Sequence, residues 1–351
     1  MGKKLMKGNV AIAEAAIHAG CKCFFGYPIT PQNELIEHMS KRLLKLEDGV
    51  FVQSESEVAA INMVFGAAGA GARVMTSSSG PGLSLKQEGI SFLAGAELPA
   101  VIVNIMRGGP GLGGIQPAQS DYFQATKGGG HGDYYTLVYA PANIQEAVNL
   151  VQLAFDKADE YRNPVMILAD GVIGQMMEPA EVPDNDNSAK YQKDWIVTGT
   201  PKSHNIIRSL YLDPNELSLH NKHLQKKYQM ITDNEVQYET AQMEDADIMV
   251  VAYGTTSRIV RSAIKEAREK GIKVGLFRPI TLWPFPNNEL KEAAKNTKAV
   301  LVAEMSAGQM IYDVKLALEG SKPVSFVGET GGIIPTTTQI LNKIMQISEV
   351  D

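Results

Sequence analysis

Three side chains stand where they could do chemistry. Glu57 begins an apolar helical pattern, Arg107 follows a long apolar run, and His131 lies among glycines. A carboxylate can accept or hold a proton, a guanidinium group can bind a carboxylate through two nitrogen atoms, and an imidazole titrates near neutral pH. Together these groups predict a site that binds a small anion and moves protons.

Each of these residues also has an ordinary structural interpretation. Ser54 and Ser56 could each cap the helix that follows, and Ser54-x-x-Glu57 matches a capping box, in which Glu57 would satisfy backbone donors at the start of a helix. Thr30 matches a helix N-cap followed by a proline at the first helical position. Arg107 could form a surface ion pair, and His131 could be a solvated loop residue. The residues alone leave both interpretations open.

The glycine-rich stretch at 108–114 contains the string Gly109-x-Gly111-x-x-Gly114 of the dinucleotide-binding fingerprint. That fingerprint requires a helix to open at its third glycine. Here the sequence continues IQPAQSDYF, with a proline inside the first turn, so we interpret the stretch as a flexible loop rather than an NAD site. Beside Arg107, such a loop leaves room for a small anion.

Helices alternate with short apolar strands along the chain, as in α/β folds. Helices are predicted over residues 8–19, 32–46, 142–161, 257–270, 288–296 and 310–318, and strands over 21–26, 98–106, 164–169, 247–254, 273–278, 299–304 and 324–329. In an open parallel sheet, ligands bind at the carboxyl ends of the strands. Thr30 and Arg107 both follow predicted strands, so we expect them at this edge.

A polar, proline-bearing stretch after Glu178 divides the chain. We predict a first domain over residues 1–178, a linker with a bridging helix over 179–244, and a smaller α/β domain over 245–351. The bridging helix is expected over 213–239, because this charged stretch has no glycine. A length of 351 residues agrees with about two domains.

The composition is that of an ordinary globular protein, with 44% hydrophobic residues, 21% charged residues and a net charge of −6. No apolar run reaches the roughly 18 residues of a membrane span, and the negative charge gives no attraction to nucleic acid. We therefore expect a cytoplasmic protein without a signal peptide, a membrane partner or a nucleic-acid partner. Cys21 and Cys23 should be reduced and buried, and two thiols are too few for an iron–sulfur cluster.

Several motifs carry a resemblance to a known family: YPITP at 27–31, SEVAAINMVFGAAGAGARVMTSSSGPGLSL at 56–85, RGGPGLGG at 107–114, KGGGHGDY at 127–134 and FRPITLWPFP at 277–286. With these motifs in this order, the whole chain resembles the α subunit of the 2-oxoacid:ferredoxin oxidoreductases. The stretch QPAQSDYFQATKGGGHGDY is most similar to the 2-oxoisovalerate (3-methyl-2-oxobutanoate) branch, and the 2-oxoglutarate branch is the near alternative.

The resemblance implies an α/β fold in two parts. The first would be the pyrimidine-binding domain of thiamine diphosphate enzymes, an open, mostly parallel sheet with helices on both faces. The second would be a smaller domain like the C-terminal domain of transketolase. The implied activity is the oxidative decarboxylation of a 2-oxoacid, of the branched-chain type, to an acyl-CoA, with ferredoxin as the electron acceptor.

The resemblance also assigns roles to residues. Glu57 would hydrogen-bond to the pyrimidine ring of the cofactor, with Glu55 as the fallback. Thr30 would contact the carbonyl group of the substrate, Arg107 would bind its carboxylate, and His131 is a further catalytic candidate. No residue of this chain is expected to bind a metal. The remaining site residues expected are Tyr27, Pro28, Ile29, Ser79 and Gly80 for the cofactor, and Gly108 and Gly109 for the substrate.

Some parts of such an enzyme are missing from this sequence. It has no Gly-Asp-Gly segment followed by Asn, the motif that binds the diphosphate and its Mg²⁺, and it has too few cysteines for a cluster. The implied partners are a β subunit that carries the diphosphate motif and the Mg²⁺, and γ and ferredoxin-like δ subunits, with the [4Fe-4S] clusters among these partners. Ferredoxin, the 2-oxoacid and CoA complete the set.

Two other functions remain open at this point. The chain could belong to another thiamine diphosphate enzyme, such as a transketolase or a dehydrogenase E1 component, although those lack the RGGP and KGGGHGD loops. It could also be a non-catalytic scaffold that assembles electron-transfer subunits. A complex that stays fully active after Glu57→Ala would favour the scaffold.

Overall fold

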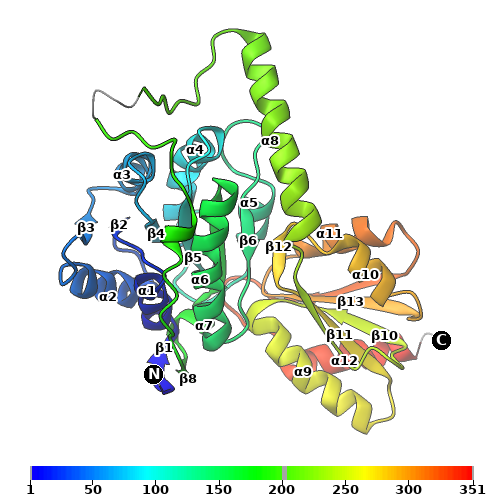
Figure 1. The fold of residues 1–351 in the computed structure, drawn as a ribbon. Coiled ribbons are helices and arrows are strands. Elements are labelled where there is room, and N and C mark those ends of the chain that lie inside the picture. The colour runs from blue at the N-terminus through cyan, green and yellow to red at the C-terminus, as the bar shows by residue number, and fades with distance from the viewer. Residues whose placement is uncertain (1, 200–203, 350–351) are drawn as a thin grey trace.

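The computed structural model of the chain describes residues 2–199 and 204–349 and shows two α/β units side by side (Figure 1). The larger unit holds a seven-stranded sheet in the order β12-β6-β7-β5-β4-β2-β3, and the smaller one a five-stranded sheet in the order β14-β13-β10-β11-β9. This architecture confirms the predicted fold class. The predicted domain limits at 178 and 245 stay a proposal.

Short, mostly buried strands build the larger sheet. They are β2 (Cys23–Gly26), β3 (Val50–Gln53), β4 (Val74–Ser78), β5 (Ala100–Met106), β6 (Leu137–Tyr139), β7 (Pro164–Asp170) and β12 (Thr281–Trp283). All seven residues of β5 and of β7 are buried, and the two strands pair in parallel from Ala100 opposite Pro164 to Met106 opposite Asp170. Continuous apolar runs suit these positions, because helices cover both faces of a parallel sheet.

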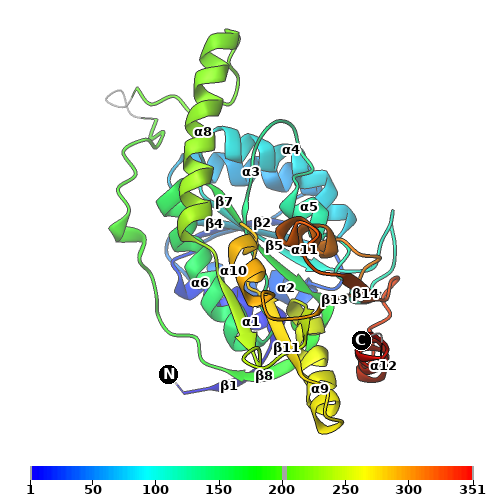
Figure 2. The same ribbon diagram turned by 90° about the vertical axis from the view of Figure 1, so that its right-hand side faces the viewer.

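Helices cover both faces of this sheet. They are α1 (Gly8–His18), α2 (Asn33–Leu43), α3 (Glu57–Gly69), α4 (Pro81–Gly95), α5 (Tyr122–Thr126), α6 (Ile144–Tyr161) and α7 (Gly171–Gln175). Helices α3 and α4 lie side by side on one face, and α1 and α6 lie on the other (Figure 2). A separate two-stranded ribbon pairs β1 (Lys4–Lys7) with β8 (Met177–Ala180).

The smaller unit repeats the same layered plan. Its strands are β9 (Tyr238–Ala241), β10 (Ile248–Val251), β11 (Val274–Pro279), β13 (Ala299–Glu304) and β14 (Val324–Gly328), and its helices are α9 (Gly254–Glu269), α10 (Asn287–Ala293), α11 (Met310–Leu318) and α12 (Thr337–Ser348). Strand β9 is antiparallel at the sheet edge, whereas β10, β11, β13 and β14 are parallel. Between β11 and α10, strand β12 leaves this unit and pairs with β6 of the larger sheet.

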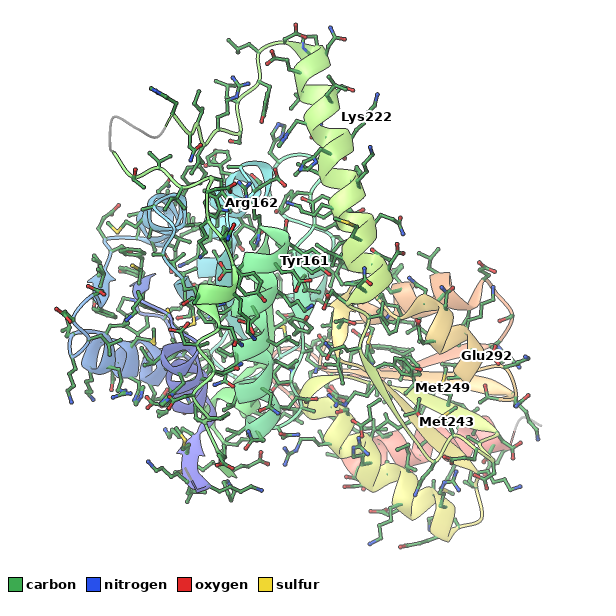
Figure 3. All side chains as sticks on the ribbon, viewed as in Figure 1. Tyr161, Arg162, Lys222, Met243, Met249 and Glu292 are labelled. Carbon is green, nitrogen blue, oxygen red and sulfur yellow. The ribbon has the colours of Figure 1, made fainter. Side chains whose placement is uncertain are left out.

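Between the two units the chain forms a 3-10 turn, η1 (Ser188–Lys190), and the long helix α8 (Pro214–Asn234). Helix α8 packs against the larger unit through its buried residues Leu224, Tyr228 and Ile231. Lys222 on the same helix points away from both sheets (Figure 3). The predicted helix over 213–239 was wrong at its end, because the chain turns at Glu235 to pair β9 with β11. Residues 200–203 of the predicted linker lie outside the described residues.

Buried polar contacts join the two units. The side chain of Gln119 donates to the carbonyl oxygen of Tyr253 at 2.9 Å and accepts from Thr256 Oγ1 at 2.7 Å and the Met305 backbone at 3.0 Å. The Asp170 carboxylate accepts from the backbone of Thr255 at 3.0 Å. Because these groups are buried and satisfied, the two units are held in one arrangement. Among the described residues, no helix is long and apolar enough to cross a membrane.

Candidate active site

A cavity of about 750 Å³ lies between the two units, where parallel strands of both sheets end. From the larger unit, Gly80, Arg107 and Asp121 line it. From the smaller unit, the loops after β13 and β14 supply the opposite wall, at residues 305–307, 309 and 330–331. The cavity therefore has the position that open α/β sheets reserve for ligands, and both halves of the chain build it.

Glu57 is the first residue of α3, and its side chain is 6% exposed. The predicted capping box was wrong: Ser56 is the N-cap and accepts from the Ala59 backbone at 3.2 Å. The hydroxyl of Ser54 instead donates to the carbonyl oxygen of Gly26, which fixes the preceding turn to the sheet. Among the described residues the Glu57 carboxylate forms no hydrogen bond, so capping does not account for it.

Glycines bring α4 against this carboxylate. A Cβ atom on Gly82 would lie 2.3 Å from the Ser78 hydroxyl oxygen and 2.4 Å from the Glu57 carboxylate, so glycine lets α4 approach both groups closely. Gly80 has φ 45° and ψ −111°, a conformation that favours glycine, and it places Pro81 at the start of α4. This turn therefore places polar groups beside Glu57 without supplying them with hydrogen-bond partners.

Two hydroxyl groups in this turn also lack partners. Ser78 and Ser79 are fully buried, and their Oγ atoms form no hydrogen bond within residues 2–199 and 204–349. A buried polar atom without a partner costs free energy unless a ligand or water satisfies it. An acid, two hydroxyl groups and a glycine cradle can together accept a ring that carries hydrogen-bonding nitrogen atoms.

The structure brings Arg107 and Thr30 together at the end of β5. The NH1 group of Arg107 donates to the carbonyl oxygen of Thr30 at 2.9 Å, and NH2 donates to the carbonyl oxygen of Leu112 at 3.0 Å. The Nε atom is buried and has no partner among the described residues. Gly80 lies beside it, since a Cβ there would be 3.7 Å from Nε. The Nε group of Arg107 is therefore a donor without a partner among the described residues, and it lies beside the turn at Gly80 that precedes α4.

The predicted N-cap at Thr30 was wrong. Helix α2 begins at Asn33 with Gln32 in the N-cap position, and Pro31 precedes the helix. Tertiary contacts fix this offset: Arg107 holds the Thr30 carbonyl, and the buried Gln32 side chain accepts from Ser77 Oγ at 2.6 Å. The Thr30 hydroxyl accepts from Asn33 Nδ2 at 3.4 Å and is not used as a cap.

The sequence interpretation assigned no role to Asp121, which lines the cavity with Arg107. Its carboxylate accepts from Asn104 Nδ2 at 3.0 Å. Burial raises the pKa of Asp121, while Asn104 and the charge of Arg107 act in the opposite direction. The sequence did carry a signal for Asp121, because it is an acidic residue in the short stretch that follows the glycine-rich loop at 108–114.

A second overlooked residue is Lys86 on α4, whose side chain is fully buried. Burial lowers its pKa to about 7, and the charge of Glu57 opposes the decrease. The signal in the sequence was a lysine on the apolar face of a helix, between Leu83 and Ile90.

The smaller unit reaches the cavity through close backbone contacts. A Cβ atom on Gly108 would lie 3.1 Å from the carbonyl carbon of Gly331, and one on Gly332 would collide with the side chain of Gln116. The loop after Arg107 is therefore covered by the loop after β14. Both cavity-lining loops of the smaller unit follow parallel strands, and their position after predicted strands was the signal by which the sequence could have identified them.

The other predicted site residues are more dispersed. Gly109 lines the cavity beside Gly108, whereas Tyr27 and Pro28 are exposed before Thr30 and Ile29 is half-buried. Glu55 is exposed and accepts from Ser56 Oγ at 3.0 Å.

His131 lies apart from the cluster around Glu57 and Arg107. Its side chain is exposed, and the preceding glycines lie against Gln87 and Ser91, further along α4. The structure therefore does not bring His131 to Glu57 within this chain, and its catalytic role stays a prediction. Cys21 and Cys23 are free and buried, as predicted. The described residues hold no group of three or more His, Cys, Asp or Glu side chains that could bind a metal.

Family models match nearly the whole chain. The model described as "Pyruvate flavodoxin/ferredoxin oxidoreductase, thiamine diP-bdg" matches residues 14–257, and "Pyruvate:ferredoxin oxidoreductase core domain II" matches residues 246–340. The ketoisovalerate oxidoreductase subunit VorB of Methanothermobacter marburgensis is 52% identical over 99% of both chains. The 2-oxoglutarate synthase subunit KorA of the same organism is 38% identical over 97% of this chain and 98% of that one.

Solved structures give the same relationship. The 2-oxoglutarate:ferredoxin oxidoreductase from Magnetococcus marinus superimposes with a TM-score of 0.87 and 27% identity, covering 98% of this chain. The present chain spans 65% of the length of that one. A split-gene transketolase superimposes with a TM-score of 0.60 at 14% identity, which shows a common fold alone.

Proposed function

The chain belongs to the 2-oxoacid:ferredoxin oxidoreductase family, and from this premise we propose that it forms half of an active site for a branched-chain 2-oxoacid. The observation that carries the proposal is the buried Glu57 carboxylate, which has no partner among the described residues and faces a glycine cradle. Glu57 lies within residues 14–257, the segment that matches the thiamine diphosphate-binding model of the family.

The residues present fit the pyrimidine end of that cofactor. Glu57 would hydrogen-bond to a ring nitrogen and hold a proton there, and the hydroxyl groups of Ser78 and Ser79 would satisfy other polar atoms of the ring. Gly82 lets α4 approach Glu57 and Ser78 closely, and Gly80 permits the turn that precedes this helix. When bound, thiamine diphosphate supplies the carbon nucleophile for 2-oxoacid decarboxylation.

Arg107 and Thr30 would hold the substrate. Its carboxylate would bind the guanidinium group, whose Nε is unpartnered among the described residues, and the Thr30 hydroxyl would contact the 2-oxo group. The loop from the smaller unit covers Gly108, and this cover would exclude water from the reacting groups.

The cavity lining favours a substrate with one carboxylate and an apolar side chain. Arg107 is the one cation among the described residues that line it, and Pro81, Pro110, Ala118, Met305 and Ala307 supply apolar surface. A 2-oxoglutarate molecule would need a second cation for its distal carboxylate. The relatives VorB, 52% and 50% identical and named ketoisovalerate oxidoreductase subunits, support the same choice.

The other half of the site would come from partner subunits. A β subunit would bind the diphosphate and Mg²⁺, and γ and ferredoxin-like δ subunits would complete the assembly, with [4Fe-4S] clusters among the partners, ferredoxin as acceptor and CoA as the second substrate. Exposed apolar side chains on α3 and α4 support a covered surface there: Val58, Met63, Leu85 and Phe92. We place the complex in the cytoplasm.

The test is to produce this chain together with its partner subunits and to record viologen reduction in the presence of CoA and thiamine diphosphate. We expect kcat/KM for 3-methyl-2-oxobutanoate to exceed that for 2-oxoglutarate, and the chain alone to be inactive. Preference for 2-oxoglutarate would contradict the substrate assignment. Decarboxylation by the isolated chain would contradict the shared site.

A further inference from the structure

Met305 is a buried methionine that lies outside both hydrophobic cores. It directly follows β13 and is 1% exposed. The buried apolar residues of the described chain form two packed clusters, and Met305 is the one larger than alanine that belongs to neither of them. It lines the cavity between the two units instead, together with Ala118, which is also buried outside both clusters. Its position therefore points to the cavity rather than to a core.

Met305 and Arg107 contact the same short segment of the chain. Arg107 forms an isolated β-bridge with Pro117, and the Ser120 hydroxyl donates to the Arg107 carbonyl oxygen at 3.2 Å. The backbone of Gln119 donates to the carbonyl oxygen of Met305 at 2.7 Å, and its side chain accepts from the Met305 backbone at 3.0 Å. The two cavity-lining residues are therefore held in the same part of the cavity, although they come from different units.

The main chain at Met305 is fixed, and its side chain is the adaptable part. The Gln119 side chain that accepts from Met305 is fully buried, and it also donates to the carbonyl oxygen of Tyr253 at 2.9 Å and accepts from Thr256 Oγ1 at 2.7 Å. Methionine is unbranched and has three rotatable bonds, so it adapts its shape to what it contacts. Met305 can therefore pack against an apolar ligand without any movement of the wall behind it.

The proposed binding mode directs the alkyl group of the substrate toward this side chain. With the carboxylate at Arg107 and the 2-oxo group at Thr30, the alkyl group extends from the other side of the 2-oxo carbon, away from Arg107. Apart from Arg107, the larger unit lines the cavity with glycine, proline, serine, alanine and one aspartate. Among the described residues that line it, Met305 has the longest apolar side chain.

We propose that Met305 limits the size of the substrate side chain: a branched five-carbon 2-oxoacid packs against it, and it excludes longer and aromatic 2-oxoacids. This inference rests on the proposed function, in which Arg107 binds the substrate carboxylate. An apolar pocket discriminates by roughly 10- to 200-fold per methylene group. The larger unit thus binds the group that all 2-oxoacids share, and the smaller unit selects among their side chains.

The test compares kcat/KM for 3-methyl-2-oxobutanoate, 4-methyl-2-oxopentanoate and phenylpyruvate, measured by viologen reduction with complexes of this chain and its partner subunits. The variants are Met305→Ala, which shortens the side chain, and Met305→Leu, which nearly conserves its volume. Met249→Ala is the control, because Met249 is fully buried in β10 of the same unit and belongs to a core cluster (Figure 3). The ratio of kcat/KM between two substrates does not depend on the fraction of active complex.

We expect Met305→Ala to raise the ratio of phenylpyruvate to 3-methyl-2-oxobutanoate by about tenfold or more, because the cavity gains the space of the missing side-chain atoms. The ratio for 4-methyl-2-oxopentanoate should rise by a smaller factor, and Met305→Leu should keep both ratios close to those of wild type. Met249→Ala should leave the ratios unchanged and lower the melting temperature more than Met305→Ala does, because it creates a cavity in a core.

Ratios that stay unchanged in Met305→Ala, or that change equally in Met249→Ala, would overturn the inference. Failure of both Met305 variants to assemble would also overturn it, since Met305 would then serve folding. If the wild-type complex oxidises none of the three 2-oxoacids, it is the proposed function that fails.

Discussion

Two buried acids in this chain have opposite surroundings. Asp170, at the seam between the units, accepts from the backbone of Val172, Ile173 and Thr255 and from the Thr255 hydroxyl. Glu57, at the start of α3 and beside Gly82 of α4, accepts from none of the described residues. Folding satisfies the first acid completely and leaves the second without a hydrogen-bond partner among the described residues. Burial alone therefore does not identify a functional acid, but burial without partners does.

The largest effect that separates the two acids should follow Glu57→Gln. We expect turnover to fall by about 10²-fold or more, because proton transfer by a positioned acid contributes roughly that much. The free energy of unfolding should change by at most about 1 kcal/mol, because no hydrogen bond within the described chain is lost. Viologen reduction and thermal unfolding of the same preparation give both quantities. Near-normal turnover would return the scaffold function to consideration.

The matched substitution at the seam is Asp170→Asn, and it should do the reverse. An amide group would turn a donor toward backbone N–H groups, at a cost of about 2–3 kcal/mol in the free energy of unfolding. Turnover per assembled complex should stay within a factor of two or so of wild type. Chemical denaturation measures the first quantity. If activity falls more than stability, the seam would belong to the catalytic apparatus.

Lys86 is a buried charged group with a single hydrogen-bond partner among the described residues, and the pH dependence of stability tests this burial. Burial lowers its pKa to about 7 in the folded chain, against 10.5 in the unfolded chain, so the unfolded state binds more protons between these values. Stability should therefore rise with pH from about 7 to about 10.5, by up to roughly 1.4 kcal/mol per pH unit. The difference between wild type and Lys86→Met in denaturant titrations isolates this contribution. A difference independent of pH would contradict the burial of a charged amine.

Arg107 has both satisfied and unsatisfied polar groups. Its NH1 and NH2 groups donate to carbonyl oxygen atoms, and its Nε has no partner among the described residues. Arg107→Lys keeps the charge and loses the planar donors. We expect KM for the 2-oxoacid to rise by about tenfold at unchanged thiamine diphosphate affinity. Steady-state kinetics and calorimetry separate these effects. Equal weakening of cofactor binding would indicate that Arg107 supports the turn at Gly80 instead.

Much of the fold followed from the sequence because its signals are local. Apolar runs over residues 98–106 and 164–169 predicted the buried strands β5 and β7, and helical periodicity predicted α6 and α9. The edge strand β12 was not predicted, because three residues carry no periodicity and its partner β6 is more than 130 positions away.

The candidate site divides in the same way. Thr30 and Arg107 were recognisable as candidates because each follows a predicted strand, and the carboxyl ends of parallel strands meet at one edge. Glu57 was recognisable as an acid at the start of an apolar helical pattern. The sequence could not show that Ser56 rather than Ser54 caps α3. The Ser54 hydroxyl donates to the carbonyl oxygen of Gly26 in β2, a contact that only the folded chain makes.

By itself, then, the sequence determined two α/β units and the edge at which their reactive side chains collect, since both follow from local periodicity and strand direction. Tertiary structure decided which of those side chains lack partners. It closed the Arg107 loop with Gly331 of the smaller unit, left His131 on the surface and buried Lys86 against Thr76 of β4. Burial and hydrogen-bond satisfaction depend on residues far apart in the chain, and only the folded chain brings those residues together.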